Sequence, residues 1–157
     1  MPGTIYFLHI LHNTVLMAAI LSWILAQAIK TVLTLIVKKK FDAERILGSG
    51  GMPSSHSAMV CSLMLGMAIK TGVSSPFFAV TFAFAAVVMY DAMGVRRAAG
   101  EQARVLNRML DKWEKQDPEL SPKEDIARKE LKEYLGHTPL EVLAGAMLGI
   151  LVALVLV

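Results

Sequence analysis

The chain has 157 residues, of which 55% are hydrophobic, and its mean hydropathy is +0.53. Its apolar residues gather in runs long enough to cross a bilayer, which excludes an ordinary soluble domain and predicts one integral membrane domain. The formal net charge of +3 forms no basic patch interleaved with aromatic residues, so we expect no nucleic-acid partner, and the lone Cys61 excludes a disulfide framework.

The first apolar run extends from Ile5 to Val37 and contains no proline or glycine. It is too long for the apolar part of a signal peptide, so we expect it to be retained in the membrane. Because a bilayer needs roughly 20 helical residues, we predict one helix from about Thr14 to Val37. Lys30 lies in its last part, where the side chain either reaches the membrane surface or faces the bundle interior. Lys38 begins the run of three lysines that ends the helix.

A glycine-rich loop follows and leads into a histidine at the start of the second helix. It reads Gly48-Ser49-Gly50-Gly51-Met52-Pro53-Ser54-Ser55-His56-Ser57. Backbone N–H groups in such a loop, serine hydroxyls and the positive end of a helix together suit a phosphate. His56 can exchange a proton near neutral pH. The alternative is a plain linker in which Ser54 or Ser55 caps the helix. Both interpretations stay open from this stretch alone.

Two apolar helices are predicted after the loop, over about residues 55–70 and 76–93, with a turn containing glycine and proline between them. Asp91 lies near the end of the second of these, where an acid in an apolar span is costly and marks a functional candidate. The alternative is a structural ion pair, for instance with Arg96 or Arg97. The two roles are compatible.

The only long polar segment covers about residues 98–136. Apolar residues at helical spacing up to Trp113 predict one amphipathic helix, and a capping-box start at Ser121 predicts a second. We expect this segment to lie on the membrane surface or to pack over the loops.

The last apolar helix is predicted from Pro139 to Val157. Thr138 is expected to be its N-cap, and Glu141 completes a capping box with it. The capping box explains Glu141. It does not explain His137, which stands immediately before the helix at the mouth of the bundle.

These elements predict an all-α polytopic membrane bundle of about four transmembrane helices with one or two surface amphipathic helices. In that topology every Lys and Arg except Lys30 and Lys70, and every acid, lies at or near one membrane face. Because cytoplasmic flanks carry an excess of Lys and Arg, we predict that this face is cytoplasmic.

The same topology gathers two histidines, several cations and a glycine-rich helix start, a combination that suits phosphoryl transfer. One histidine can attack phosphorus, the other can protonate the leaving oxygen, and cations can stabilise the developing charge, so neither a metal nor a cofactor is required. The gathered residues are Lys38, Arg45, Ser54, Ser55, His56, Asp91, Arg96, Arg97, His137 and Glu141.

These residues resemble the motifs of the type-2 phosphatidic acid phosphatase and vanadium haloperoxidase superfamily. Lys38 and Arg45 have the spacing of its Lys-x6-Arg-Pro motif, and residues 53–56 are similar to Pro-Ser-Gly-His. His137 and Glu141 match the last two positions of Ser-Arg-x5-His-x3-Asp. Over nearly its whole length the chain looks like the divergent bacterial and plastid branch of that superfamily.

The resemblance implies one phosphatase-like domain over residues 1–157 that hydrolyses a lipid phosphate of the phosphatidate, phosphatidylglycerol phosphate or prenyl phosphate class. It implies that His137 is the nucleophile and forms a phosphohistidine, that Glu141 orients it, and that His56 protonates the leaving group. The phosphate ligands that it implies are Lys38, Arg45, Ser54 and Ser55. A bacterial inner membrane, or a plastid membrane, is the expected location.

The motifs are not matched everywhere. The proline, glycine and aspartate of the patterns are replaced by Ile46, Ser55 and Glu141. Leu131 stands where the third motif has its arginine. We expect Arg96 or Arg97 to supply that cation from the third helix, with Lys132 or Arg128 as alternatives.

Other functions are compatible with this sequence. A non-catalytic membrane protein could keep the pocket and bind an anionic head group or a partner protein. A small transporter or assembly factor has less support because no internal repeat is present, and a haloperoxidase has the least. Four spans are fewer than the six helices usual in the membrane phosphatases, so surface helices or a second subunit, as in a homodimer, would complete the bundle.

Overall fold

The computed structural model describes residues 10–38, 51–116, 131 and 136–157. Five helices make up this part of the chain: α2 (Thr14–Lys38), α4 (Ser55–Thr71), α5 (Pro76–Met93), α6 (Val95–Gln116) and α7 (Pro139–Leu156). The predicted limits of the four apolar helices are confirmed to within one or two residues. The amphipathic helix expected from Ser121 lies outside the described residues, as does Arg45.

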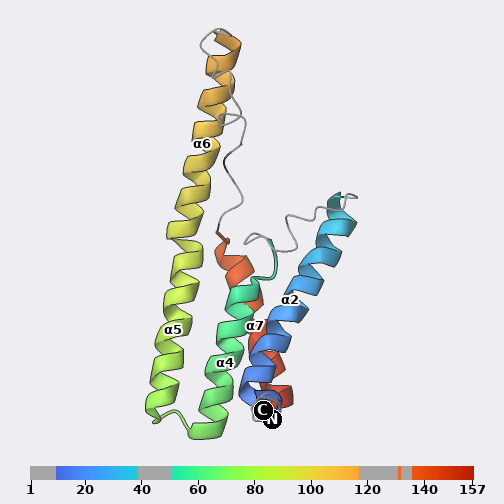
Figure 1. Cartoon of the computed structure of the whole chain (residues 1–157), viewed down its shortest axis with the longest axis vertical. Coiled ribbons are helices and arrows are strands. Elements are labelled where there is room, and N and C mark those ends of the chain that lie inside the picture. The colour runs from blue at the N-terminus through green and yellow to red at the C-terminus, as the bar shows by residue number, and fades with distance from the viewer. Residues whose placement is uncertain (1–9, 39–50, 117–130, 132–135) are drawn as a thin grey trace, which may run out of the picture.

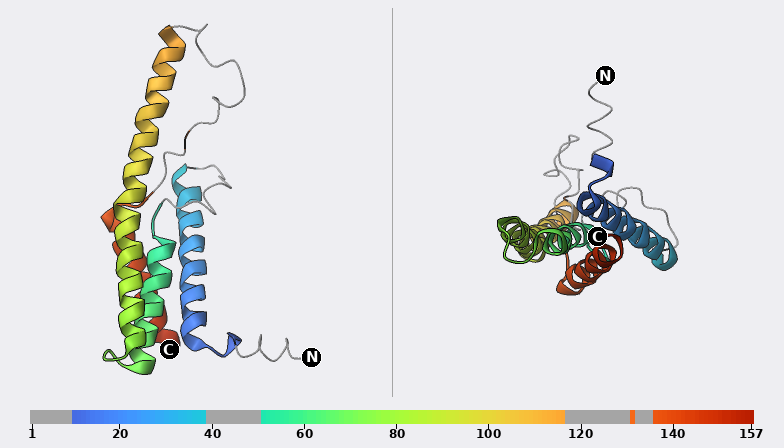
Figure 2. Two further views of the ribbon diagram at one scale, coloured as in Figure 1. Left: turned by 60° about the vertical axis from the view of Figure 1, so that its left-hand side comes forward. Right: turned by 90° about the horizontal axis from the view of Figure 1, so that it is seen from below.

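The helices α2, α4, α5 and α7 lie side by side as a bundle (Figure 1). α4 and α7 both begin at the same end of the bundle and run in the same direction, whereas α2 and α5 run the opposite way (Figures 1 and 2). α4 is central, because it has the most extensive packing contacts in the bundle, against α7, α2 and α5. The all-α membrane bundle expected from the sequence is therefore confirmed.

Three stretches of the described chain are long and apolar enough to cross a membrane: most of α2, the continuous stretch Pro76–Trp113 that contains α5, and α7. Large apolar side chains on these helices are exposed, as at Phe77 and Leu151, which suits contact with lipid. α4 has 17 residues and presents small ones to its neighbours, among them Ser57, Ala58 and Ser62. A helix surrounded by other helices needs small residues that let backbones approach, rather than a bulky lipid-facing surface.

α4 and α7 approach each other through two glycines four residues apart on α7. A Cβ atom at Gly145 would collide with the backbone carbonyl of Ser54, and one at Gly149 would collide with the carbonyl of Ala58. This spacing of small residues is the one that brings membrane helices into backbone contact. It fixes the depth of α7 against α4, and with it the relative position of the two helix beginnings.

α6 continues the direction of α5 beyond the end of the bundle (Figures 1 and 2). We had expected an amphipathic helix lying on the membrane surface or packed over the loops, and the structure differs. Only Gly94 separates the two helices, and its N–H and C=O take part in helical hydrogen bonds to Tyr90 and from Ala98. Because the hydrogen-bonded path runs through Gly94, α6 stays close to the axis of α5.

Candidate functional site

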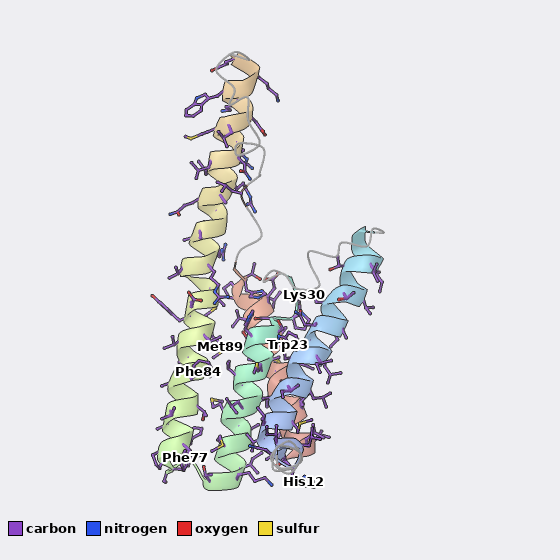
Figure 3. All side chains as sticks on the ribbon, in the orientation of Figure 1. His12, Trp23, Lys30, Phe77, Phe84 and Met89 are labelled. Atoms are coloured by element: carbon purple, nitrogen blue, oxygen red, sulfur yellow. The ribbon has the colours of Figure 1, made fainter. Side chains whose placement is uncertain are left out.

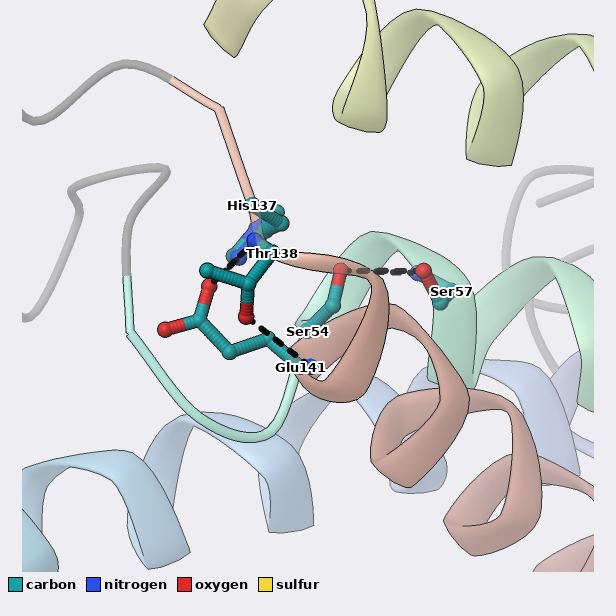
Figure 4. A network of polar contacts seen from close by, with 5 residues as sticks. All are labelled: Ser54, Ser57, His137, Thr138 and Glu141. Atoms are coloured by element: carbon teal, nitrogen blue, oxygen red, sulfur yellow. Dashed lines mark hydrogen bonds and ion pairs between the residues drawn. The ribbon is translucent and has the colours of Figure 1, made fainter.

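The start of α7 joins a histidine to the capping box of the helix. Glu141 Oε2 accepts a hydrogen bond from the backbone N–H of Thr138 at 2.9 Å, and it lies 3.2 Å from Nδ1 of His137 (Figure 4). The backbone N–H of Glu141 donates to Thr138 Oγ1 at 3.3 Å, which completes the predicted capping box. One carboxylate oxygen therefore caps the helix and holds the imidazole at the same time.

His137 is almost completely buried, with 2% of its surface exposed. Because a carboxylate only accepts hydrogen bonds, its contact assigns the ring proton to Nδ1 and leaves the lone pair on Nε2. Nε2 is buried and has no hydrogen-bond partner among the described residues. Burial lowers the pKa of His137 below its ordinary value of 6.5, while the hydrogen bond and charge of Glu141 oppose that shift. Burial thus favours the neutral ring.

Backbone contacts fix His137 in place from a second side. Its N–H donates to the carbonyl of Ala92 near the end of α5, at 2.9 Å. The preceding residue, Gly136, has a φ of +86° and lies so close to the backbone of Arg96 and Arg97 that any Cβ would collide with it. A glycine is required here by both its backbone conformation and its contact. His137 is therefore tied to the α5–α6 junction before α7 begins.

The start of α4 lies beside the start of α7. The N–H of Ser54 donates to the carbonyl of Glu141 at 3.0 Å, and this backbone hydrogen bond links the two helices directly. The hydroxyl of Ser54 accepts from the N–H of Ser57 at 3.4 Å and from the hydroxyl of Ser57 at 3.0 Å (Figure 4). Ser54 is the N-cap of α4, which confirms the capping interpretation for this serine. Ser55 is buried in the first turn.

His56 lies in the first turn of α4 and is half-buried. The charges of Arg96, Lys30 and Asp91 all act on it, and it in turn acts on His137. Arg96 and Asp91 form an ion pair through Nε and Oδ2, so the ion-pair interpretation of Asp91 is confirmed. Residues from α2, α4, the α5–α6 junction and the start of α7 thus share one electrostatic environment.

Lys30 is the site neighbour that the sequence left undecided. It is 2% exposed, so it faces the interior of the bundle. Its charge acts on His56, His137 and Glu141. The pattern of small residues on α2 contains the signal that could have decided this. Val15, Ala18, Ala19, Ser22 and Ala26 are buried at helical spacing, and Lys30 continues their face.

The remaining candidates lie at different distances from this centre. Lys38 is the last residue of α2, eight residues after Lys30 and therefore about 12 Å further along the helix. Figures 1 and 2 show that this end of α2 diverges from α4 and α7. Arg97 is half-exposed and pairs with Glu101 on the next turn of α6, Nε to Oε1 at 3.2 Å.

Leu131, at the position of the motif arginine, is held against α6. Its N–H donates to Asn107 Oδ1 at 3.1 Å, and Asn107 Nδ2 donates to its carbonyl at 2.9 Å. Asn107 is the thirteenth residue of α6, the helix that continues beyond the bundle (Figure 1). In the described part of the chain, no group of three or more His, Cys, Asp or Glu side chains is placed to hold a metal ion.

Comparison with known proteins assigns the chain to a family. The model of the divergent PAP2 family matches residues 11–152. The chain belongs to this family. Consistent with that, it is 43% identical to YuiD, an uncharacterized membrane protein of Bacillus subtilis (strain 168), over 95% of this chain and 97% of that protein. No solved structure matches the chain. Membership makes the chain a phosphatase-related membrane protein, and the family match contains His56, His137 and Glu141.

Proposed function

We propose that this protein is a membrane phosphatase that hydrolyses a lipid phosphate through a phosphohistidine intermediate. The observation that carries the proposal is the state of His137. Its ring is buried, Nδ1 is held by Glu141, and Nε2 has no hydrogen-bond partner among the described residues. An imidazole held this way keeps its nucleophilic lone pair on the nitrogen opposite the carboxylate.

The chemistry follows from these positions. Nε2 of His137 attacks phosphorus, so that a P–N bond forms while the P–O bond to the lipid alcohol breaks. His56 donates the proton that the leaving oxygen takes up. Water then attacks phosphorus and gives a proton to His56, and the P–N bond breaks to release phosphate. Glu141 keeps Nδ1–H in place and stabilises the positive charge on the ring in both steps.

Charge at the site supports an anionic substrate. Both α4 and α7 begin here, and the N-terminus of each helix carries a partial positive charge. Arg96 lies close enough to act on His56. In this proposal Arg96 binds phosphate, and Lys38, Arg45, Ser54, Ser55 and Arg97 remain further proposed ligands from the motif match.

The substrate class is proposed from the surroundings of the site. The outer faces of α5 and α7 expose large apolar side chains, so a substrate with acyl or prenyl chains can reach the end of the bundle from within the lipid. The distribution of Lys and Arg supports a cytoplasmic active face. Similarity to a Bacillus membrane protein supports a bacterial inner membrane.

The test is phosphate release from phosphatidate in mixed micelles by the purified protein. We expect turnover by the wild type and its loss in both His137→Ala and His56→Ala. His12→Ala is the matched control, because His12 is exposed at the opposite end of the bundle (Figure 3). Acid-labile label on the protein from radioactive substrate, absent in His137→Ala, would identify the phosphohistidine. Wild-type activity in both histidine variants would refute the mechanism.

A second function, binding of an anionic head group without turnover, is favoured by one observation. Leu131 replaces the motif arginine, and its backbone is held by Asn107 on the projecting part of α6. A protein of this kind would bind phosphatidate in vesicles through the same charges and would form no phosphohistidine. Trapping the intermediate therefore separates the two functions.

A further inference from the structure

We propose that Lys30 binds the substrate phosphate from α2 and supplies the positive charge that the missing motif arginine would otherwise provide. The inference rests on the proposed function for the identity of the anion as a phosphate ester. It assigns a ligand that none of the three motifs contains, on a helix that contributes only Lys38 to them.

The position of Lys30 is the first argument. It is on the same helix face as the small residues that pack against the bundle, and it is buried to 98% while the large apolar residues beside it are exposed, as at Ile29 and Leu33. Figure 3 shows Lys30 between α2 and the beginnings of α4 and α7. A lysine this close to the end of a span could place its ammonium group at the membrane surface by extending outward. This lysine instead lies inside, where desolvation of its charge is unfavourable.

The contact with the glycine-rich loop is the second argument. Gly51 has a φ of +93°, and a Cβ on it would lie 3.4 Å and 3.5 Å from Cγ and Cδ of Lys30. The aliphatic part of the lysine therefore passes along the end of that loop, directly before Ser54 and α4. The residue with the buried charge therefore lies beside Gly51, in the described end of the loop whose composition suits a phosphate.

The third argument is the balance of charge around Nε2 of His137. Lys30 acts electrostatically on His56, His137 and Glu141. Glu141 is an acid that acts on Lys30, and its Oε2 also accepts from Thr138 and contacts His137. The second acid near His56, Asp91, is paired with Arg96. The two helix N-termini add positive potential. A phosphate dianion placed here would be attracted by these positive groups, and the ammonium group of Lys30 would stabilise the negative charge that develops on the phosphoryl oxygens.

The alternative is that Lys30 only stabilises the fold by pairing with Glu141. The two roles predict opposite results for Lys30→Met, which preserves the length of the side chain and removes its charge. A purely structural pair that loses one buried partner destabilises the fold and leaves ligand binding intact in the protein that folds. If Lys30 binds the ligand, removing its charge lowers the affinity for the anion and the rate of hydrolysis. The fold is not destabilised in that case, because the unfavourable desolvation of a buried charge is removed.

The experiment compares Lys30→Met and Lys30→Arg with Lys70→Met, a control on an exposed lysine at the opposite end of α4. The readouts are kcat/KM for phosphatidate, inhibition by orthovanadate, and the shift in thermal unfolding that inorganic phosphate produces. We expect Lys30→Met to lower kcat/KM by about 10²- to 10³-fold and to weaken orthovanadate inhibition to a similar extent. Lys30→Arg should recover most of both losses, and Lys70→Met should match the wild type.

Several results would overturn the inference. If Lys30→Met retains wild-type kcat/KM and orthovanadate inhibition while His137→Ala is inactive, Lys30 is not a ligand and the proposed function survives. If the wild type hydrolyses nothing, the phosphate-induced thermal shift decides alone. A shift in the wild type that Lys30→Met lacks supports the lysine and refutes turnover, whereas no shift in either refutes both. If Lys30→Met and Lys30→Gln both fail to fold while Lys30→Arg folds, the lysine is structural.

Discussion

The beginnings of α4 and α7 are neighbours, and both are capped by a hydroxyl residue. They differ in the contacts that each cap makes outside its own helix. At α4 the hydroxyl of Ser54 is engaged by the backbone and side chain of Ser57, so the cap is closed on itself. At α7 the cap extends beyond the helix, because Glu141 also holds His137, whose Nε2 is buried with no hydrogen-bond partner in the described ranges. Similar capping signals thus produce one cap whose hydroxyl is used within its own helix and one cap that also holds a histidine.

The difference lies in a single added contact. Each cap satisfies backbone N–H groups that a helix start leaves without partners. Only the cap of α7 uses a charged side chain, and a carboxylate can orient an imidazole while it caps. Variants can therefore separate capping from orientation at α7, and α4 provides the internal comparison.

Glu141→Gln should have the largest effect. One oxygen of Glu141 makes both contacts, so either the amide oxygen takes its place and keeps both without the negative charge, or the amide NH₂ takes its place. The NH₂ would lose the hydrogen bond from Thr138 and donate to Nδ1 of His137, which favours the tautomer with its proton on Nε2. We expect activity to fall by about 10³- to 10⁴-fold, the scale seen when the carboxylate that orients a catalytic histidine becomes an amide. Phosphate release measures it, and Asp111→Asn, which alters an exposed acid on α6, is the control. Full activity in Glu141→Gln would show that Glu141 caps α7 but that its charge is not needed to orient His137.

Gly149→Val tests whether the adjacent beginnings of α4 and α7 depend on the close packing of Gly149 against Ala58. The added side chain would collide with the carbonyl of Ala58 on α4, so the helices must separate. Overpacking of this kind destabilises by about 1–3 kcal/mol. Thermal unfolding in detergent measures it, with Met147→Leu on the exposed face of the same helix as the control. Unchanged stability would show that α4 and α7 do not require this backbone contact.

The pH dependence of activity sharpens the interpretation of His137. Because burial lowers its pKa below 6.5, the ring should stay neutral and reactive at pH 6.5, and the rate should fall tenfold per pH unit only below the lowered pKa. Glu141→Gln removes the two influences that raise this pKa, so the acid limb of its residual activity should move to lower pH. An acid limb above pH 6.5 in the wild type would contradict this assignment.

The same shift affects stability, with a definite sign. Below pH 6.5 the unfolded chain binds a proton at His137 that the folded protein resists, so this group lowers stability as the pH falls from 6.5 through the lowered pKa. Comparing the thermal unfolding of the wild type and of His137→Gln over that pH range measures the contribution of His137 to the pH dependence of stability.

Thr138→Ala separates capping from orientation in the opposite direction. It removes the hydroxyl that caps α7 and leaves the contact between His137 and Glu141 in place. We expect a loss of about 1 kcal/mol in stability and a much smaller loss of activity than in Glu141→Gln. If Thr138→Ala is as inactive as Glu141→Gln, the cap and the histidine cannot be treated separately.

Ser57→Ala should have the smallest effect. It removes the hydroxyl that donates to Ser54 and keeps the backbone N–H bond of the cap. The loss should be about 0.5–1.5 kcal/mol in unfolding free energy, with activity near that of the wild type. A large loss of activity in the folded variant would show that the hydroxyl pair of Ser54 and Ser57 does more than cap α4.

The sequence was sufficient for features that depend on local signals. Run lengths and caps gave the limits of α2, α4, α5 and α7, and the capping box at Thr138 was confirmed. The ion pair of Asp91 with Arg96 was among the alternatives, because the two residues lie five apart across the helix end.

Features that depend on the direction in which a helix faces were harder to predict. The sequence analysis left Lys30 between the surface and the interior, although the small residues at helical spacing on α2 indicate the face that packs into the bundle. The prediction that α6 lies on the membrane surface or packs over the loops was wrong, because hydrogen bonding through Gly94 keeps α6 in line with α5. The contact of Leu131 with Asn107 joins residues 24 positions apart and has no sequence signature.

The interruption at Gly94 has a consequence for His137. The last carbonyls of a helix accept no hydrogen bond from within the helix, and Ala92 is in the final turn of α5. Its carbonyl receives the N–H of His137 instead of a helical one. A seamless helix from Pro76 to Gln116 would use that oxygen internally, and the chain before α7 would lose its attachment to α5. One glycine thus turns the middle of a long rod into a docking point for the segment that bears the imidazole.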